Sequence, residues 1–237
     1  MKSYFIEKIQ DTSTDWSFRF SIPEDFVYKA GQFSVIKVNP KYEDYRNNIR
    51  TCSLSSSPTE PFLQFTFTIR DTGFKKAFMD LVAGEEVELT QAKGKMTLED
   101  ANCNEIVMIA GGIGVAPYRG MIRYAFDSLM SDLKITLLYT DKTIDELCYK
   151  NEFDEIQQKY NRLNIIYTLT RHTQDSGEWG GLTGRINPEF IKNHVSDMDD
   201  PTYLVCGPGE MVLEIISQLN MNGVKREKII AELFTGY

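Results

Sequence analysis

The chain has 237 residues, 42% of them hydrophobic, and a formal net charge of -8. This apolar fraction is enough for one large or two smaller cores, while the acidic balance argues against a nucleic-acid-binding protein, which needs a clustered basic surface. No apolar run reaches the ~20 residues of a membrane span, the N-terminus lacks a secretory signal, and the four cysteines are too dispersed for a metal site or a disulfide scaffold. We therefore expect a soluble, cytoplasmic protein with no metal centre.

The first part of the chain contains short runs rich in β-branched and aromatic residues, separated by glycine and proline. Helical spacing occurs there only around residues 75–81. This pattern predicts an all-β antiparallel barrel or sandwich with one inserted helix. The expected strands are 4–9, 16–22, 32–38, 49–53, 62–69 and 86–90.

The expected strand 49–53 carries polar side chains on both of its faces. Arg50 and Cys52 share one face, and Ser53 lies on the other. A single arginine on a strand is usually a solvated surface residue, so this segment alone indicates no function.

A second polar segment joins the expected strand 62–69 to the helix. Arg70 and Gly73 are followed by Lys75 and Lys76, which fall in the first helical turn. Lysine opposes the helix dipole at this position unless an anion lies nearby, so the segment is a candidate phosphate site. The alternative is that both lysines are simply solvated.

A glycine-rich corner follows a short apolar run at residues 106–110, which predicts a buried strand. Gly111, Gly112 and Gly114 come next, and helical spacing resumes after Pro117. A strand, a tight turn and a helix N-terminus in this order bind phosphate through free backbone N–H groups. The alternative is an ordinary βα loop whose glycines only allow close packing.

The rest of the chain alternates between strand and helix patterns, which predicts a parallel α/β sheet covered on both faces. Ligands of such sheets bind at the carboxyl ends of the strands. The segments 141–145, 171–185 and 206–208 should therefore surround the glycine-rich corner. The expected strands are 134–139, 164–170, 202–206 and 228–234, and the expected helices are 118–130, 145–160, 188–194 and 210–222.

Six short motifs, taken in order, resemble the ferredoxin-NADP reductase superfamily over essentially the whole chain. The resemblance implies an FAD-dependent NAD(P)H oxidoreductase in its stand-alone two-domain form, with a flavin-binding β-barrel domain at residues 1–103 and an NAD(P)-binding α/β domain at residues 104–237. The motifs are AGQF (30–33), RTCS (50–53), GGIGVAP (111–117), GLTGRI (181–186), CGP (206–208) and ELF (232–234).

The resemblance assigns flavin contacts to the barrel. Arg50 matches the arginine that pairs with the flavin pyrophosphate, and Ser53 matches the serine that hydrogen-bonds the flavin ring. Cys52 stands where the family has a stacking tyrosine. Gly73 matches the pyrophosphate turn, but Lys76 replaces a common serine or threonine, which leaves FMN as an alternative to FAD. The further flavin-binding residues that it implies are Thr51, Ile69, Arg70, Lys75, Ala77, Phe234 and Tyr237.

The resemblance also assigns the nicotinamide side, with Ser53, Cys206 and Glu232 as catalytic residues. Cys206 matches a cysteine beside the nicotinamide, Glu232 an acid near the reaction centre, and Phe234 an aromatic that covers the flavin. Tyr237 is an alternative cover, and the structural alternatives are a buried strand end for Cys206 and an anchored last strand for Phe234. The implied nucleotide-binding residues also include Gly111, Gly112, Gly114, Val115, Pro117, Thr140, Asp141, Arg171, Arg185, Gly207 and Pro208.

The choice of nucleotide depends on charge. A 2'-phosphate needs arginines, whereas a free ribose diol prefers a carboxylate. Asp141 stands where NADPH-using relatives often have an arginine, which favours NADH, while Arg171 and Arg185 favour NADPH. We expect NADH.

The chain contains no haem motif and no iron–sulfur cysteine spacing, so electrons should pass to a separate acceptor such as a ferredoxin, flavodoxin, cytochrome or oxygenase component, or to a small molecule. Two alternatives remain open. One is an electron-transfer subunit of a larger complex, of the dihydroorotate dehydrogenase or hydrogenase type, although no iron–sulfur cysteines follow the last strand. The other is a nucleotide-binding module without turnover.

Overall fold

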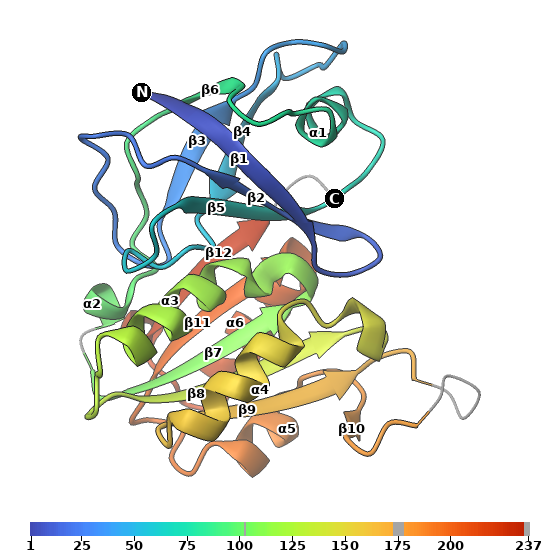
Figure 1. Ribbon diagram of the computed structural model, residues 1–237. Helices are drawn as coiled ribbons and strands as arrows, with labels where there is room; N and C mark the ends of the chain where they lie inside the picture. The colour runs from blue at the N-terminus through green and yellow to red at the C-terminus, as the bar shows by residue number, and fades with distance from the viewer. Residues whose placement is uncertain (102, 173–177, 235–237) are drawn as a thin grey trace. The chain divides into compact units, whose positions relative to one another are not determined.

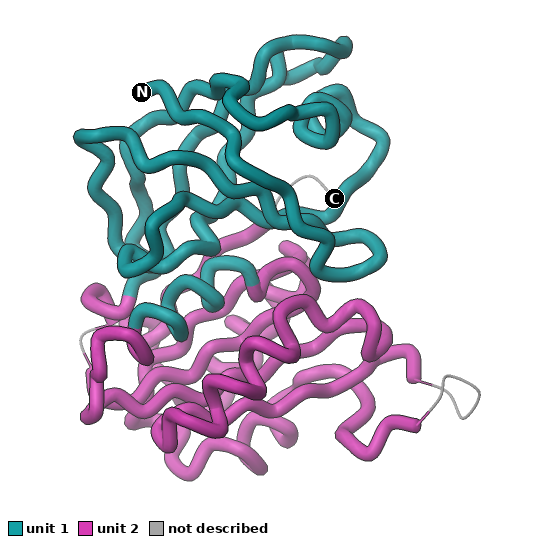
Figure 2. The backbone as a smooth tube through the Cα atoms, in the orientation of Figure 1, with its two compact units in different colours: residues 1–97, 116–124 teal, residues 98–115, 125–237 magenta. Residues whose placement is uncertain are grey.

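The computed structural model describes residues 1–101, 103–172 and 178–234 (Figure 1). The chain divides into two compact units, residues 1–97 with 116–124 and residues 98–115 with 125–237 (Figure 2). The first unit thus includes most of a helix that begins well after its strands.

The first unit is built on a six-stranded antiparallel sheet in the order β4-β3-β6-β1-β2-β5. An antiparallel bridge joins Leu54, just after β4, to Phe65 in β5, so the two outer strands of the sheet meet. This closure agrees with the predicted small barrel. The elements are β1 (Lys2–Gln10), β2 (Asp15–Phe20), β3 (Phe33–Lys37), β4 (Ile49–Ser53), β5 (Leu63–Thr68), α1 (Gly73–Met79) and β6 (Glu86–Leu89).

Aromatic side chains fill the core of this unit and hold α1 against the sheet. Phe74 and Phe78 of α1 are buried, and Phe78 meets Phe18 edge to face with 5.2 Å between the ring centroids. Such ring pairs add roughly 0.5–1.5 kcal/mol to the free energy gained by burying their area. This pair holds α1 against β2, and the pair of Phe67 and Phe74, with 6.0 Å between the ring centroids, holds the start of α1 against β5.

The second unit is built on a parallel six-stranded sheet in the order β10-β9-β8-β7-β11-β12, which confirms the predicted α/β class. The strands β7 and β11 are almost entirely buried, as expected for the centre of a parallel sheet. The strands are β7 (Glu105–Gly111), β8 (Lys134–Asp141), β9 (Leu163–Leu169), β10 (Leu182–Thr183), β11 (Thr202–Pro208) and β12 (Ile229–Phe234). The helical segments are α2 (Leu98–Ala101), η1 (Gly112–Val115), α3 (Ala116–Asp127), η2 (Ile144–Glu146), α4 (Lys150–Lys159), α5 (Pro188–His194), α6 (Gly209–Met221) and η4 (Arg226–Lys228).

The single helix predicted for residues 145–160 is wrong in its first part. A short turn, η2, precedes α4, and Tyr149 between them has a left-handed backbone with φ of 63°. The Cys148 N–H donates to the Tyr139 hydroxyl over 3.0 Å instead of continuing a helix. A local periodicity cannot reveal this contact with another strand.

Two short elements were not predicted because they carry too little pattern. The helix α2 has four residues and β10 only two. Within the described ranges, no helix is long and apolar enough to cross a membrane, and no group of three or more acidic, histidine or cysteine residues is arranged to hold a metal ion.

Candidate functional site

Arg50 is a fixed residue of β4 rather than a freely solvated arginine. Its Nη2 donates to Asp44 Oδ2 over 2.8 Å, and its Nη1 donates to the Ile49 carbonyl oxygen over 2.8 Å. The side chain is only 16% exposed, and the guanidinium lies 5.0 Å from the centroid of the Phe74 ring. Arg50 is thus held beside the start of α1.

Lys75 brings a second cation to this place. Its pKa is lowered to about 8 because burial disfavours the ammonium, and the positive charges of Arg70 and Arg50 add to that effect, while Asp15 opposes it more weakly. Among the described residues, no ion pair engages the Lys75 ammonium. A bound anion would remove the cost of holding these positive charges together, so the cluster of Arg50, Arg70 and Lys75 fits a phosphate-bearing ligand.

Lys76, the other lysine of the predicted phosphate segment, is engaged elsewhere. It forms an exposed ion pair with Asp71 at 2.5 Å. The expectation of a solvated lysine therefore describes Lys76, and not Lys75.

Gly73 allows the loop before β4 to pack directly on the first turn of α1. A Cβ at this position would lie 2.2 Å from the carbonyl oxygen of Glu43. The Thr72 hydroxyl accepts the Lys75 N–H over 3.3 Å and caps the helix. Of the other predicted flavin residues, Thr51 and Arg70 are exposed, Ser53 and Ile69 are half-buried, and Ala77 is buried.

Cys52 packs against the aromatic core of the first unit. Burial raises its pKa to about 12, although Lys75 and Arg50 act in the opposite direction. The thiol is therefore neutral at physiological pH, and this position offers a small apolar surface in place of an aromatic ring.

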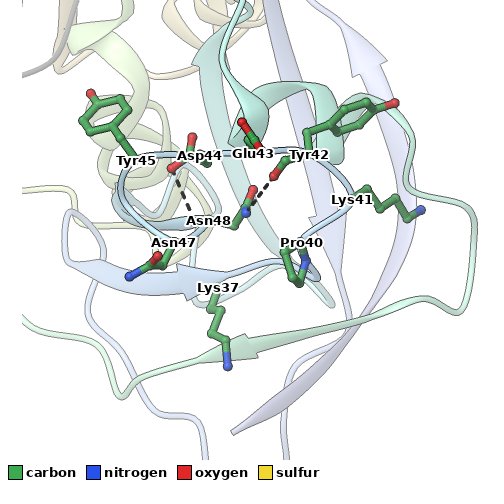
Figure 3. A pocket seen from close by; sticks show the side chains of 9 residues that line it. All are labelled: Lys37, Pro40, Lys41, Tyr42, Glu43, Asp44, Tyr45, Asn47 and Asn48. Carbon is green, nitrogen blue, oxygen red and sulfur yellow. Dashed lines mark hydrogen bonds between the residues drawn. The ribbon is translucent and has the colours of Figure 1, made fainter.

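A shallow hollow of about 1040 Å³ lies in the β3–β4 loop of the same unit (Figure 3). Asp44 and Tyr45 belong to its lining. The Tyr45 side chain is exposed, and its ring centroid lies 5.5 Å from the Arg50 guanidinium. Two lining residues of the hollow, Asp44 and Tyr45, thus contact Arg50 of the charged cluster.

In the second unit, the glycine-rich segment has the predicted order of strand, tight turn and helix start. The strand β7 ends at Gly111, the turn η1 follows, and α3 begins at Ala116 with Pro117 as its second residue. A Cβ at Gly114 would lie 2.4 Å from the Cys206 carbonyl oxygen. A Cβ at Gly112 would meet, among the described residues, only Asp141 Oδ2, at 3.9 Å. Close packing accounts for Gly114, and Gly112, with φ of 53°, leaves open space above the turn.

Parallel register brings two of the predicted catalytic residues, Cys206 and Glu232, side by side near the carboxyl ends of the strands. Cys206 in β11 is opposite Ala110 of β7 on one side and Glu232 of β12 on the other. Gly207 and Pro208 complete β11, next to Leu233 and Phe234. The predicted meeting of strand ends therefore holds for this part of the sheet.

Both Cys206 and Glu232 have raised pKa values, and the Glu232 charge contributes to the shift of Cys206. Burial raises the pKa of Cys206 well above its ordinary value, and the Glu232 charge raises it further. Burial also raises the pKa of Glu232 to about 7. The pair offers a neutral thiol beside a carboxyl group that changes charge near neutral pH.

Thr140 and Asp141 end the neighbouring strand β8. The Thr140 hydroxyl is buried and has no hydrogen-bond partner within the part of the chain that the structure describes. Thr140 is in register with Gly111. Buried hydroxyl groups normally have partners, so Thr140 is a candidate contact for a ligand over the glycine-rich corner.

Arg171 and Arg185 are both exposed. The Arg171 N–H donates to the Lys142 carbonyl oxygen over 3.0 Å, which joins the two loops after β8 and β9. The predicted residue Tyr237 lies outside the described residues.

Sequence reasoning missed a buried ion pair and a buried carboxylate. Arg119 of α3 donates to Glu60 Oε2 and Oε1 over 2.7 and 2.9 Å, and to the Ser55 carbonyl oxygen over 3.0 Å. This pair holds residues 116–124 within the first unit. The carboxylate is that of Asp44, and no motif in the sequence marks either one.

Comparisons with known proteins agree with this architecture. Residues 108–215 match the model of the oxidoreductase NAD-binding domain family. One subunit of the Na(+)-translocating NADH-quinone reductase of Pseudoalteromonas atlantica is 25% identical in an alignment of 232 residues that covers 92% of this chain and 56% of that protein. NADH-cytochrome b5 reductase 1 of Mortierella alpina is 25% identical over 215 residues, 89% of this chain and 71% of that protein.

A solved structure shares the fold over the whole chain. It is a ferredoxin NADP+ reductase from Neisseria gonorrhoeae with bound FAD and NADP, with a TM-score of 0.81, 20% sequence identity and coverage of 98% of both chains. The present chain spans just over half the length of the quinone reductase subunit that it matches.

Proposed function

We propose that this chain is a ferredoxin reductase-type, FAD- and NAD(P)-binding two-domain oxidoreductase, which takes electrons from NADH through FAD and passes them to a separate acceptor. The family is one of NAD(P)H-dependent flavoprotein reductases. The observation that carries the proposal is the cluster of Arg50, Arg70 and Lys75 at the start of α1, because such a cluster fits the diphosphate of a flavin dinucleotide.

Bound FAD would accept an electron pair from a nicotinamide and release the electrons one at a time. Arg50 and Lys75 would hold its diphosphate by charge at the start of α1, where Gly73 lets the loop before β4 pack closely. Ser53, at the end of β4, would donate a hydrogen bond to the flavin ring. Because Cys52 stands where the family has a stacking tyrosine, another side chain would have to cover that face of the flavin ring.

The nucleotide would lie over the glycine-rich corner of the second unit. Gly111, Gly112 and Gly114, with Val115 and Pro117, would form the backbone turn that receives its diphosphate. The Thr140 hydroxyl and the loops that carry Arg171 and Arg185 would contact its sugar groups, and Gly207 and Pro208 would border the nicotinamide.

The preference for NADH rests on Asp141. Its carboxylate lies 3.9 Å from the Cβ position of Gly112, and a carboxylate accepts hydrogen bonds from a ribose diol but repels a 2'-phosphate. The exposed Arg171 and Arg185 are the groups that would favour NADPH. The ratio of kcat/KM for NADH to kcat/KM for NADPH measures this preference directly.

Cys206 and Glu232 would form the protein side of the reaction centre. The neutral thiol would orient the nicotinamide without adding charge. The carboxyl group, whose charge depends on pH, would change the electrostatic potential at the nicotinamide. Phe234, which ends β12, would cover the flavin, and this role could be shared with Tyr237.

The acceptor would be a ferredoxin, flavodoxin, cytochrome or oxygenase component, and the similarity to a cytochrome b5 reductase supports a one-electron acceptor. A second candidate is favoured by the other relative, which is a subunit of an NADH-quinone reductase and of which this chain spans only 56%. In that case the chain would feed electrons to further parts of an assembly. The proposed domain limits are residues 1–103 for flavin and 104–237 for the nucleotide.

Reconstitution followed by turnover tests the proposal. The purified protein is loaded with FAD or FMN, and reduction of a one-electron dye is measured with NADH and with NADPH. We expect stable retention of FAD and faster dye reduction with NADH. A protein that retains neither flavin, or that retains one and reduces no dye with either nucleotide, would overturn the proposal.

A further inference from the structure

The loop between β3 and β4 is built around one buried carboxylate, that of Asp44 (Figure 3). The loop returns to β4 through Asn47 and Asn48, whose φ values of 53° and 57° are left-handed, a conformation that asparagine tolerates. The Asn48 Nδ2 donates to the Tyr42 carbonyl oxygen over 3.3 Å. The loop therefore has a defined conformation that places Asp44 at its inner side.

Asp44 accepts four hydrogen bonds although its side chain is only 1% exposed. Its Oδ1 accepts the N–H groups of Arg46 at 2.9 Å and Asn48 at 3.4 Å, within the loop. Its Oδ2 accepts the Arg50 guanidinium at 2.8 Å and the Phe74 N–H at 3.1 Å. One carboxylate thus connects the loop, β4 and the first turn of α1.

These partners keep the carboxylate charged. Burial alone would raise the pKa of Asp44, but the hydrogen bonds from Arg50, Arg46 and Phe74 outweigh it and hold the pKa below its ordinary value. A buried charge with such a set of donors is costly to change, because removing the charge leaves the Arg50 guanidinium without its counter-ion.

The same contacts fix the direction of the Arg50 side chain. Its Nη1 and Nη2 each donate one hydrogen bond, and its planar group lies over the rings of Phe74 and Tyr45. A guanidinium has five N–H donors. Three of them have no acceptor among the described residues, so they remain for a ligand.

We propose that Asp44 is a positioning residue for the phosphate groups of the flavin cofactor: it orients Arg50 and joins it to the start of α1, so that both face one phosphate-bearing ligand. This inference rests on the proposed function and adds to it a residue that acts through Arg50 without contacting the isoalloxazine. Its consequence is selective, because only ligands with phosphate depend on Asp44.

The test compares three ligands that differ in phosphate content. Dissociation constants of riboflavin, FMN and FAD are measured by fluorescence quenching for the wild type, Asp44→Asn and Glu43→Gln. The asparagine keeps the shape and one acceptor oxygen but removes the charge. Glu43→Gln removes a charge from an exposed side chain one residue away and is the matched control.

We expect Asp44→Asn to weaken FMN and FAD binding about tenfold and to leave riboflavin binding within twofold of the wild type. Glu43→Gln should leave all three constants unchanged. In an Arg50→Ala background, Asp44→Asn should have little further effect on FAD binding, because its effect passes through Arg50.

Three results would overturn the inference. Equal loss of riboflavin and FAD binding would show a merely structural role. Unchanged FAD binding by Asp44→Asn would show that the carboxylate does not position Arg50 for the ligand, and tighter binding would show that it competes with phosphate. Thermal unfolding of Asp44→Asn shows whether a loss of binding comes from a folding defect. If Asp44→Asn is unstable, Asp44→Glu, which keeps the charge, should recover FAD binding. A wild type that binds no flavin would instead remove the proposed function itself.

Discussion

The two units provide candidate phosphate-binding sites of different kinds. The first unit gathers charged side chains, with Arg50 held by the buried Asp44 and with Lys75 at a lowered pKa. The second unit has no such cluster at its corner among the described residues; Gly112 leaves space above the turn there, and Gly114 lets the turn pack closely against Cys206. One site depends on charge, and the other on the absence of side chains.

This difference indicates how tightly each ligand should be held. A charge-based site that is partly assembled before binding suits a cofactor that stays with the protein. A backbone site binds a dinucleotide without a large electrostatic attraction, which suits a substrate that must leave in every cycle. Substitutions should therefore affect the two ligands separately.

The largest effect is expected for Gly114→Ala. The new Cβ would lie 2.4 Å from the Cys206 carbonyl oxygen, so the backbone must move, at a cost of about 1–3 kcal/mol. We expect NADH-driven dye reduction to fall by roughly 100-fold. FAD affinity should remain within twofold of the wild type.

Gly180→Ala is the matched control, because no atom of the described residues lies within 4 Å of its Cβ position. It should leave both NADH-driven dye reduction and FAD affinity unchanged. Loss of FAD binding in Gly114→Ala equal to the loss of NADH use would show that the two sites are not separate.

Arg50→Ala should have the opposite selectivity. It removes a charge-assisted contact worth roughly 1.5–3 kcal/mol, so FAD affinity should fall about 10- to 150-fold. Binding of NADH to the second unit should not change. Equilibrium dialysis with FAD, and a separate titration with NAD+, give the two constants.

Arg46→Ala is a useful control for this variant, since Arg46 is exposed and also lies near the Tyr45 ring. It should retain FAD. Full FAD affinity in Arg50→Ala would refute the assignment of the charged cluster.

Glu232→Gln should change the pH dependence of stability. The pKa of Glu232 is about 7 in the folded protein and 4.5 ordinarily, so the unfolded chain loses its proton first as pH rises. Wild-type stability should therefore fall relative to Glu232→Gln between about pH 4.5 and pH 7, by roughly 3 kcal/mol, and the difference should be constant above that window.

Urea unfolding at several pH values measures this difference. Parallel curves for the two proteins across the whole window would show that Glu232 is not held in a neutral form, and the description of the reaction centre would need another carboxyl group.

The smallest effect is expected for Cys206→Ala. The substitution removes a buried, neutral thiol, so flavin reduction by NADH should slow by about tenfold while FAD affinity stays the same. Rapid mixing under anaerobic conditions measures the rate. A larger effect on FAD binding than on the rate would move Cys206 out of the reaction centre.

Much of this arrangement could be predicted from the sequence, because it follows from local pattern. An apolar run followed by glycines and a proline predicts the glycine-rich corner, and the sheet register then brings Cys206 and Glu232 together. Arg50 could be given a role only through its resemblance to a family motif, since one arginine on a strand carries no pattern.

What could not be predicted depends on contacts between distant segments. Asp44 meets Phe74, 30 positions away, and Arg119 meets Glu60, 59 positions away. The break before α4 similarly depends on a hydroxyl group from β8. In each case the sequence near the residue is unremarkable, and only the fold supplies the partner.

An anaerobic titration of the FAD-loaded protein with NADH tests the central claim most directly. We expect the flavin absorbance at about 450 nm to bleach with one equivalent of NADH per flavin. Bleaching with NADPH should be slower. A flavin that stays oxidised with excess NADH and NADPH would contradict the claim that this chain transfers electrons from a nicotinamide nucleotide.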